Sequence, residues 1–202
     1  MIGILDYGVG NLKNVSTAVK NCSRDAIISN DTEKLKDCDG LILPGVGAFG
    51  DSIKMLNASG LRDFLDTWVS DNKYVLGICV GMQMMFERSY EYGVHEGLGY
   101  LKGEVVEFKG DLKVPHMGWN ELHIKKESKL LEGINENDFV YFVHSFYAPA
   151  EVESCIAYTD YGVNFSAVVN HNNLYATQFH PEKSSNIGNK ILQNYLNMVY
   201  EK

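Results

Sequence analysis

A short strand that turns sharply into a helix at a cysteine is the feature that most constrains this chain. Residues 74–78 are typical of a buried strand, and residues 80–88 repeat apolar side chains near helical spacing. Gly77 and Gly81 stand two residues before and two residues after Cys79. Because glycine has no Cβ to collide in a tight turn, the pattern predicts that Cys79 is held on a sharp elbow, as is the serine of a G-x-S-x-G hydrolase.

Strands and helices alternate in the first half of the chain, whereas short strands dominate after Gly99. The predicted strands of the first half are residues 2–5, 25–29, 41–43 and 75–78, and the predicted helices are residues 11–20 and 51–69, the latter interrupted at Gly60. The later predictions are strands at residues 105–108, 119–124 and 139–143, a hairpin over residues 167–179 and a helix at residues 187–200. This order predicts an α/β fold whose central sheet binds ligands beyond the carboxyl ends of its strands.

Length and composition indicate one compact unit. The chain has 202 residues, 45% of them hydrophobic, and no linker or internal repeat interrupts it, so we expect a single domain spanning residues 1–202. The first residues lack the basic and apolar regions of a signal peptide, which predicts a cytoplasmic protein that uses no membrane. A net charge of −8, with 18 basic against 26 acidic residues, argues against a nucleic-acid partner.

Two interpretations of Cys79 are open from its own neighbourhood, because a free cysteine in an apolar run is commonly only a small buried hydrophobe. The distal tripeptide His180-Pro181-Glu182 favours the catalytic interpretation. A residue before proline prefers extended angles, so His180 and Glu182 are expected to project from the same side of an extended segment. A cysteine, a histidine that exchanges its proton and an acid that orients the histidine are the groups required for nucleophilic acyl transfer.

The cysteine elbow and the distal His-Pro-Glu together resemble the class I, triad-type glutamine amidotransferases. Further segments resemble one branch of that family, the glutaminase subunits of imidazole glycerol phosphate synthase. These segments are residues 6–12, 43–49, 115–120 and 142–145. The resemblance implies a three-layer fold with a mixed, mostly parallel sheet flanked by helices. It also implies a glutaminase of histidine biosynthesis that uses Cys79, His180 and Glu182, with neither a metal nor an organic cofactor.

A glycine-rich stretch over residues 45–50 matches G-x-G-x-x-G and raises the alternative of a dinucleotide site. A dinucleotide-binding fold expects an acid at the end of the next strand, but that strand ends in Cys79. The better interpretation is an oxyanion hole, with backbone NH groups near Val46 and Gly47 as one donor and the NH of Val80 as the second.

The resemblance implies that glutamine is held by a defined set of groups. They match Gly47, Gln83, Glu91, Ser145 and Phe146. From the residues alone, Gln83 lies one helical turn after Cys79 and would face the same cleft, whereas Glu91 would equally suit a solvated helix end.

A second protein is also implied, because the family passes its ammonia to a cyclase subunit of imidazole glycerol phosphate synthase. The positions that match the partner-facing side of the family are Asn11, Trp119, Asn120, Tyr141 and Lys183. Without the resemblance, a tryptophan such as Trp119 would be assigned more simply to a core.

Three departures from the family pattern leave alternatives open: Val80, Phe146 and residues 176–177 stand where leucine, tyrosine and Gly-Val are more usual. None of them is a triad position. A sister glutaminase that feeds a different ammonia-using synthase therefore remains an alternative. A further alternative is a catalytically silent subunit that only regulates a synthase by binding.

Overall fold

An eight-stranded sheet forms the centre of the computed structural model, which describes residues 1–201. The strands lie in the order β2-β1-β3-β4-β14-β13-β12-β9, parallel from β2 to β14 and antiparallel from β14 to β9. Their bounds are β1 Ile2–Leu5, β2 Ala26–Ser29, β3 Gly40–Gly45, β4 Val75–Cys79, β9 His123–Ile124, β12 Cys155–Asp160, β13 Asn164–His171 and β14 Leu174–Thr177. The structure thus confirms the predicted mixed, mostly parallel sheet.

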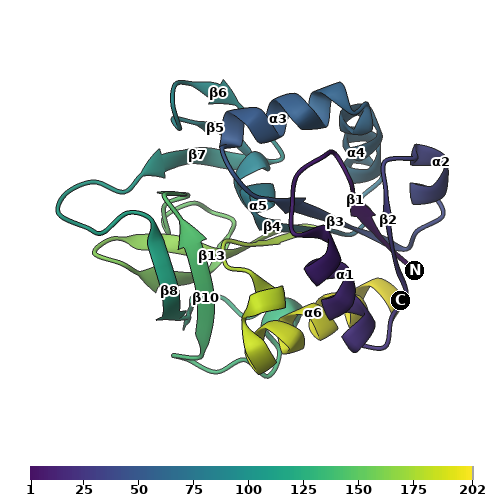
Figure 1. The fold of residues 1–202 in the computed structure, drawn as a ribbon. Coiled ribbons are helices and arrows are strands. Elements are labelled where there is room, and N and C mark those ends of the chain that lie inside the picture. The colour runs from purple at the N-terminus through teal and green to yellow at the C-terminus, as the bar shows by residue number, and fades with distance from the viewer. Residues whose placement is uncertain (202) are drawn as a thin grey trace.

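Helices cover both faces of this sheet and make three layers (Figure 1). On one side lie α1 (Leu12–Asn21) and α6 (Ser185–Tyr200), and on the other lie α3 (Phe49–Ala58) and α4 (Leu61–Ser70). The short helix α2 (Thr32–Leu35) follows β2. Gly60 separates α3 from α4 with a left-handed φ of 76°, which confirms the predicted interruption. None of the helices within residues 1–201 is long and apolar enough to cross a lipid bilayer.

Two smaller sheets extend from the side of the molecule where the parallel strands end (Figure 1). One pairs β8 (His116–Glu121) with β10 (Phe139–His144), and the other has the order β11-β7-β5-β6. The bounds in the second sheet are β5 Phe86–Ser89, β6 His95–Glu96, β7 Leu101–Glu107 and β11 Phe146–Tyr147. The remaining elements are the helix α5 (Val80–Met84) and two 3-10 turns, η1 (Lys129–Leu131) and η2 (Pro181–Lys183).

The elbow is the junction between β4 and α5, and its backbone is strained. Cys79 has φ 55° and ψ −112°, an unfavourable conformation for a residue with a side chain. A Cβ at Gly81 would lie 2.0 Å from the Leu43 carbonyl oxygen, so α5 approaches β3 as closely as it does only because position 81 carries no side chain. The prediction of a glycine-dependent turn at Cys79 is therefore confirmed.

Three predicted elements are wrong in extent. The strand expected over residues 105–108 begins four residues earlier, as β7. The helix expected over residues 80–88 ends at Met84, because Phe86–Ser89 pairs instead with β6 and β7 as a strand. The strand expected over residues 119–124 is divided between β8 and β9, which belong to different sheets. The hairpin and the last helix are confirmed, while β12 was not predicted although it is the neighbour of β13.

Candidate active site

A cavity of about 320 Å³ opens where the parallel strands end. Cys79 reaches it from the end of β4, and Gly47 reaches it from the loop after β3. The end of β10 and the start of β11 form another wall, and His180 enters from the loop that follows β14. The lining also includes the other predicted oxyanion and glutamine-binding positions, which are Val46, Val80, Gln83, Glu91, Ser145 and Phe146. Segments far apart in sequence thus converge, because β3, β4 and β14 end at one edge of the central sheet and the strands β10 and β11 of the two smaller sheets each have one end beside them.

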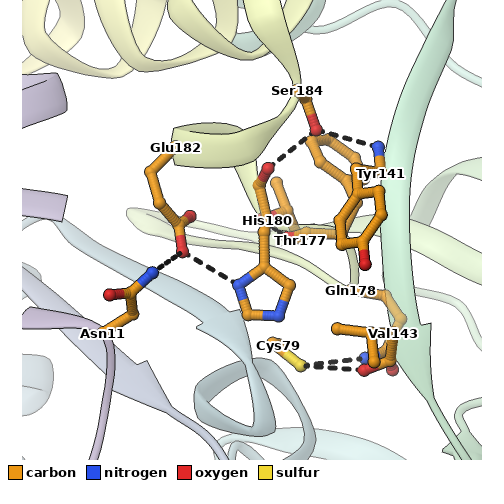
Figure 2. Close-up of polar contacts among 10 residues, drawn as sticks. Asn11, Cys79, Tyr141, Val143, Thr177, Gln178, His180, Glu182 and Ser184 are labelled. Carbon is orange, nitrogen blue, oxygen red and sulfur yellow. Dashed lines mark hydrogen bonds and ion pairs between the residues drawn. The ribbon is translucent and has the colours of Figure 1, made fainter. Parts of the chain in front are cut away.

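His180 lies between Cys79 and Glu182 (Figure 2). Its Nδ1 atom is 2.9 Å from Glu182 Oε1, and both side chains are almost wholly buried. Asn11 donates a hydrogen bond from Nδ2 to the same carboxylate oxygen at 3.4 Å. Asn11, predicted at the partner face, therefore also helps to orient Glu182.

The charge state of His180 follows from these neighbours. Burial on its own lowers the pKa of His180, but hydrogen bonds and electrostatic attraction involving Cys79 and Glu182 outweigh burial and raise the pKa to about 9. The ring is therefore an imidazolium at neutral pH, facing the sulfur of Cys79.

The expectation that His180 and Glu182 project from one extended segment is wrong for Glu182. Only His180 is extended, with φ −95° and ψ 99°, and the chain then enters the 3-10 turn η2. Ser184 secures this turn, because its hydroxyl donates to the His180 carbonyl at 2.7 Å and accepts from the Tyr141 amide at 2.9 Å (Figure 2). The turn brings the carboxylate back to Nδ1, so the pair forms by a different local geometry.

The side-chain amides of Gln83 and Gln178 form a buried, hydrogen-bonded pair beside Cys79. Gln83 donates from Nε2 to the Phe146 carbonyl at 2.8 Å and to Gln178 Oε1 at 3.0 Å. Gln178 in turn directs its Nε2 at Cys79 Sγ, 3.8 Å away, and the Val143 carbonyl lies 3.9 Å from the same sulfur (Figure 2). Gln83 thus supports the wall of the cavity as well as lining it.

Glu91 lines the cavity and also caps the N-terminus of α3. Its Oε2 accepts a 2.6 Å hydrogen bond from the Phe49 amide, at the first residue of α3. Burial raises the pKa of Glu91, and the Phe49 amide partly opposes this effect. Glu91 is therefore not a solvated helix-end acid.

Three of the predicted partner positions, Trp119, Tyr141 and Lys183, lie together beside the cavity. Trp119 is 52% exposed and packs edge-on against Tyr141 across the β8–β10 ladder, with ring centroids 6.1 Å apart. Lys183 Nζ lies 5.9 Å from the Tyr141 ring and Lys183 also lines the cavity. Asn120 follows Trp119 on β8 and donates to the Asp160 carbonyl at 2.9 Å. An exposed tryptophan rules out the simpler assignment of Trp119 to the core.

Behind this cluster, two buried histidines form a chain of neutral hydrogen bonds. His144 Nδ1 is 2.9 Å from the Phe146 carbonyl, which can only accept, so Nδ1 carries the proton. Its Nε2 is then the acceptor for His116 Nδ1 at 3.1 Å, and His116 Nε2 faces Asn120 Nδ2 at 3.4 Å. Burial lowers the pKa of His116 to about 4 and that of His144 to about 3, so both rings are neutral at pH 7.

Acid is expected to destabilise the protein through these rings. Because their folded pKa values lie below the ordinary 6.5, the unfolded chain binds more protons, and stability is lost as the pH falls from 6.5 toward 4 and 3. By this linkage the free energy of unfolding at pH 5 is lower by roughly 2 kcal/mol for each ring. The raised pKa of His180 has the opposite effect. Its contribution to the free energy of unfolding is complete below pH 6.5 and is lost as the pH rises through about 9.

The measurement is urea unfolding at pH 7.5 and pH 5 for the wild type and His144→Phe. Phenylalanine fits the surrounding aromatic cluster without titrating, and the His180 effect is common to both proteins. The variant should lose roughly 2 kcal/mol less on acidification. Equal losses in the two proteins would contradict the assignment of neutral, buried rings.

Within residues 1–201, no group of three or more histidine, cysteine, aspartate or glutamate side chains is arranged to hold a metal ion. The absence of a metal or cofactor requirement stays a prediction, based on chemistry that the side chains of the cavity can perform themselves.

Comparison with known proteins decides the family. The family model described as "Glutamine amidotransferase class-I" matches residues 3–198. The chain belongs to the class I glutamine amidotransferase family. This amidotransferase is 46% identical over 200 residues to the imidazole glycerol phosphate synthase subunit HisH of Caldanaerobacter subterraneus subsp. tengcongensis, covering 98% of each chain. It is 48% identical over 206 residues to the subunit of the same name from Geobacillus thermodenitrificans, covering 98% and 96% of the two chains.

The fold of the amidotransferase is shared more widely than its sequence. A solved structure described as a glutamine amidotransferase superposes with a TM-score of 0.76 at 20% identity, covering 98% of each chain. At that identity the likeness concerns the fold alone.

Sequence reasoning about this amidotransferase missed Gln178, which the structure places beside Cys79. A signal for it was present, because Gln178 is two residues before His180 and alternate residues of an extended segment point to the same side. The missing information was that this side faces the elbow.

Proposed function

We propose that the chain is the glutaminase of an imidazole glycerol phosphate synthase. It hydrolyses glutamine to glutamate and ammonia, and passes the ammonia to a cyclase that makes imidazole glycerol phosphate and AICAR in histidine biosynthesis. The observation that carries the proposal is the buried His180, which bridges Cys79 and Glu182 at the wall of a cavity. Relatives that are 45% to 48% identical over nearly the whole chain are subunits of imidazole glycerol phosphate synthase, which supports the proposal.

In the first step the Cys79 thiolate attacks the side-chain carbonyl carbon of glutamine. His180, protonated at neutral pH, gives its proton to the departing nitrogen, so the carbon–nitrogen bond breaks and ammonia leaves. A γ-glutamyl thioester remains. His180, now neutral, takes a proton from water as the water attacks the thioester, and collapse of the adduct breaks the carbon–sulfur bond to release glutamate. Glu182 holds Nδ1 throughout and stabilises each imidazolium.

Each tetrahedral adduct carries an oxyanion that needs donors. Val80 is the first residue of α5, so its amide has no partner within the helix. Gly47 lines the same cavity next to Val46, with a left-handed φ of 85° and no atom within 4 Å of where a Cβ would be. We assign the oxyanion hole to the Val80 amide and an amide at Val46 or Gly47; by analogy with proteases one such donor is worth about 3 kcal/mol.

Glutamine is held in the same cavity. The predicted glutamine-binding positions Gly47, Gln83, Glu91, Ser145 and Phe146 all line it. In this proposal Glu91 binds the α-amino group of glutamine, because it is the one carboxylate side chain of that lining. The whole chain, residues 1–202, acts as one glutaminase domain in the cytoplasm.

The cyclase docks on a surface that includes the cluster of Trp119, Tyr141 and Lys183, together with Asn11 and Asn120. An exposed tryptophan that packs against a tyrosine, near a lysine, is the kind of residue that anchors protein interfaces. Lys183 joins this cluster to the cavity, so the docked partner would cover the side on which ammonia is released.

The test of the proposal is glutamate release from glutamine, measured with and without the cyclase and its nucleotide substrate. We expect strong stimulation when both are present. A rate of glutamine hydrolysis that does not change when the cyclase is added would support the glutaminase chemistry but contradict the proposed partner. That result would favour a sister glutaminase that serves another synthase. Absence of any glutamine hydrolysis would leave only a binding role.

Titrating the cyclase into the same assay gives its affinity and thereby tests the docking surface. Trp119→Ala should weaken cyclase binding by roughly 30-fold, which is about 2 kcal/mol for a central aromatic anchor. Tyr92→Ala is the matched control, because Tyr92 is 88% exposed and lies between β5 and β6, outside the cluster. Equal affinities of both variants for the cyclase would remove Trp119 from the interface.

A further inference from the structure

We propose that Gln178 is a positioning residue for Cys79. Its side-chain amide donates to the sulfur from the buried side and holds the thiolate in the line of attack. The inference rests on the proposed role of Cys79 as nucleophile. It concerns a residue that the mechanism above does not use.

The burial of Gln178 makes its two side-chain contacts significant. The residue is fully buried, and its amide carries both a donor and an acceptor group that need partners there. Gln83 satisfies the oxygen at 3.0 Å, and Cys79 Sγ lies 3.8 Å from the nitrogen. The sulfur of the proposed nucleophile is therefore one of the two partners of this amide.

The orientation of the Gln178 amide is determined by the Phe146 backbone carbonyl, which is linked to it by hydrogen bonds through Gln83. The Phe146 carbonyl can only accept, so Gln83 must present its NH₂ group to it, at 2.8 Å. That same NH₂ group faces Gln178, which must therefore present its oxygen to Gln83. The NH₂ group of Gln178 is then left for Cys79 Sγ. An amide flip at Gln178 would set two donors against each other, so the chain of contacts keeps a donor on the sulfur.

A donor in this position distinguishes the two states of Cys79. A thiolate accepts strongly from an amide NH, whereas a neutral thiol is a weak acceptor. The Val143 carbonyl, 3.9 Å away, suits the thiol because it can accept from it. Gln178 thus favours the reactive form and limits its rotation, while His180 approaches from the other side (Figure 2).

The test uses the alkylation rate of Cys79 by iodoacetamide at pH 7, followed by mass spectrometry of the Cys79 peptide. Gln178→Met keeps the approximate volume but removes both polar contacts, and should slow alkylation about tenfold, the effect of one charge-assisted hydrogen bond. Gln178→Glu keeps the acceptor for Gln83 but turns a carboxylate oxygen toward the sulfur, and should slow alkylation further. Gln193→Met is the matched control, because Gln193 lies on α6 and bonds Asn197 there.

A double-mutant cycle separates positioning from simple packing. Gln83→Met frees the Gln178 amide to flip and should therefore also slow the alkylation of Cys79. In the double variant, Gln83→Met should not lower the alkylation rate below that of Gln178→Met alone. Alkylation rates within twofold of wild type in a folded Gln178→Met protein would overturn the proposal, as would purely additive effects. If Gln178→Met does not fold, Gln178→Glu and Gln83→Met decide by the same criterion. Alkylation needs no glutamine, so the outcome is independent of whether the complex proves to be a glutaminase.

Discussion

Replacing Cys79 with serine is expected to abolish glutamine-dependent synthesis while ammonia-dependent synthesis by the complex continues. The serine hydroxyl fills nearly the same space on the elbow but is not ionised beside His180, so the first step loses its nucleophile. Loss of a nucleophile typically lowers kcat by about 10³ to 10⁶. The measurement is product formation by the reconstituted synthase, supplied first with glutamine and then with ammonium salt.

Cys22→Ser provides the control, because Cys22 is also a buried free thiol but lies next to α1 and α6, where its sulfur contacts the Asn189 carbonyl. It should retain both activities. A Cys79→Ser complex that used glutamine at the wild-type rate would refute the thioester mechanism. Loss of both activities would indicate a damaged interface instead.

Gly81→Ala is expected to have the largest effect on folding. The added Cβ would lie 2.0 Å from the Leu43 carbonyl oxygen and 3.0 Å from its carbon, both of them backbone atoms of β3. Neither can move without displacing a central strand from its neighbours β1 and β4. We expect a loss of about 3 to 5 kcal/mol in the free energy of unfolding, in the upper range for overpacking, together with loss of glutamine hydrolysis. Urea unfolding monitored by circular dichroism measures the first effect.

Gly60→Ala is the matched control. Gly60 has a left-handed φ of 76°, whereas Gly81 lies within the helix α5, and no atom lies within 4 Å of where the Gly60 Cβ would be. Its substitution carries conformational strain without a clash, and should cost about 1 kcal/mol. If the two variants lose similar stability, the close approach of α5 to β3 is not what requires glycine at position 81.

The site also shows why local sequence patterns succeed for some features and fail for others. The elbow was predictable, because the strand, the flanking glycines and the helix are all adjacent in the chain. The helix end at Met84 was not, since Phe86 to Ser89 are extended by pairing with β7, which begins twelve residues after β5 ends. Pairing between strands that are separated in the sequence overrides local propensity, and the sequence of residues 80–88 alone does not predict this pairing.

The histidine and the acid illustrate the same division. The tripeptide His180-Pro181-Glu182 indicated the chemistry, but the extended geometry inferred from Pro181 was wrong beyond His180, because the 3-10 turn is held by Ser184 against β10. The second role of Asn11, as a donor to Glu182, depends on a contact between residues 171 positions apart.

By itself the sequence determined the identity of the reactive groups, the alternation of strands and helices, and the order in which both occur. These features are local, since they follow from residue type, spacing and glycine placement. Only the tertiary structure decided which groups meet: His180 with Cys79, Gln83 with Gln178 and Phe146, and His116 with His144. The physical reason is that these contacts arise at the shared edge of packed sheets, where hydrogen-bond direction and burial depend on partners brought together from distant parts of the chain.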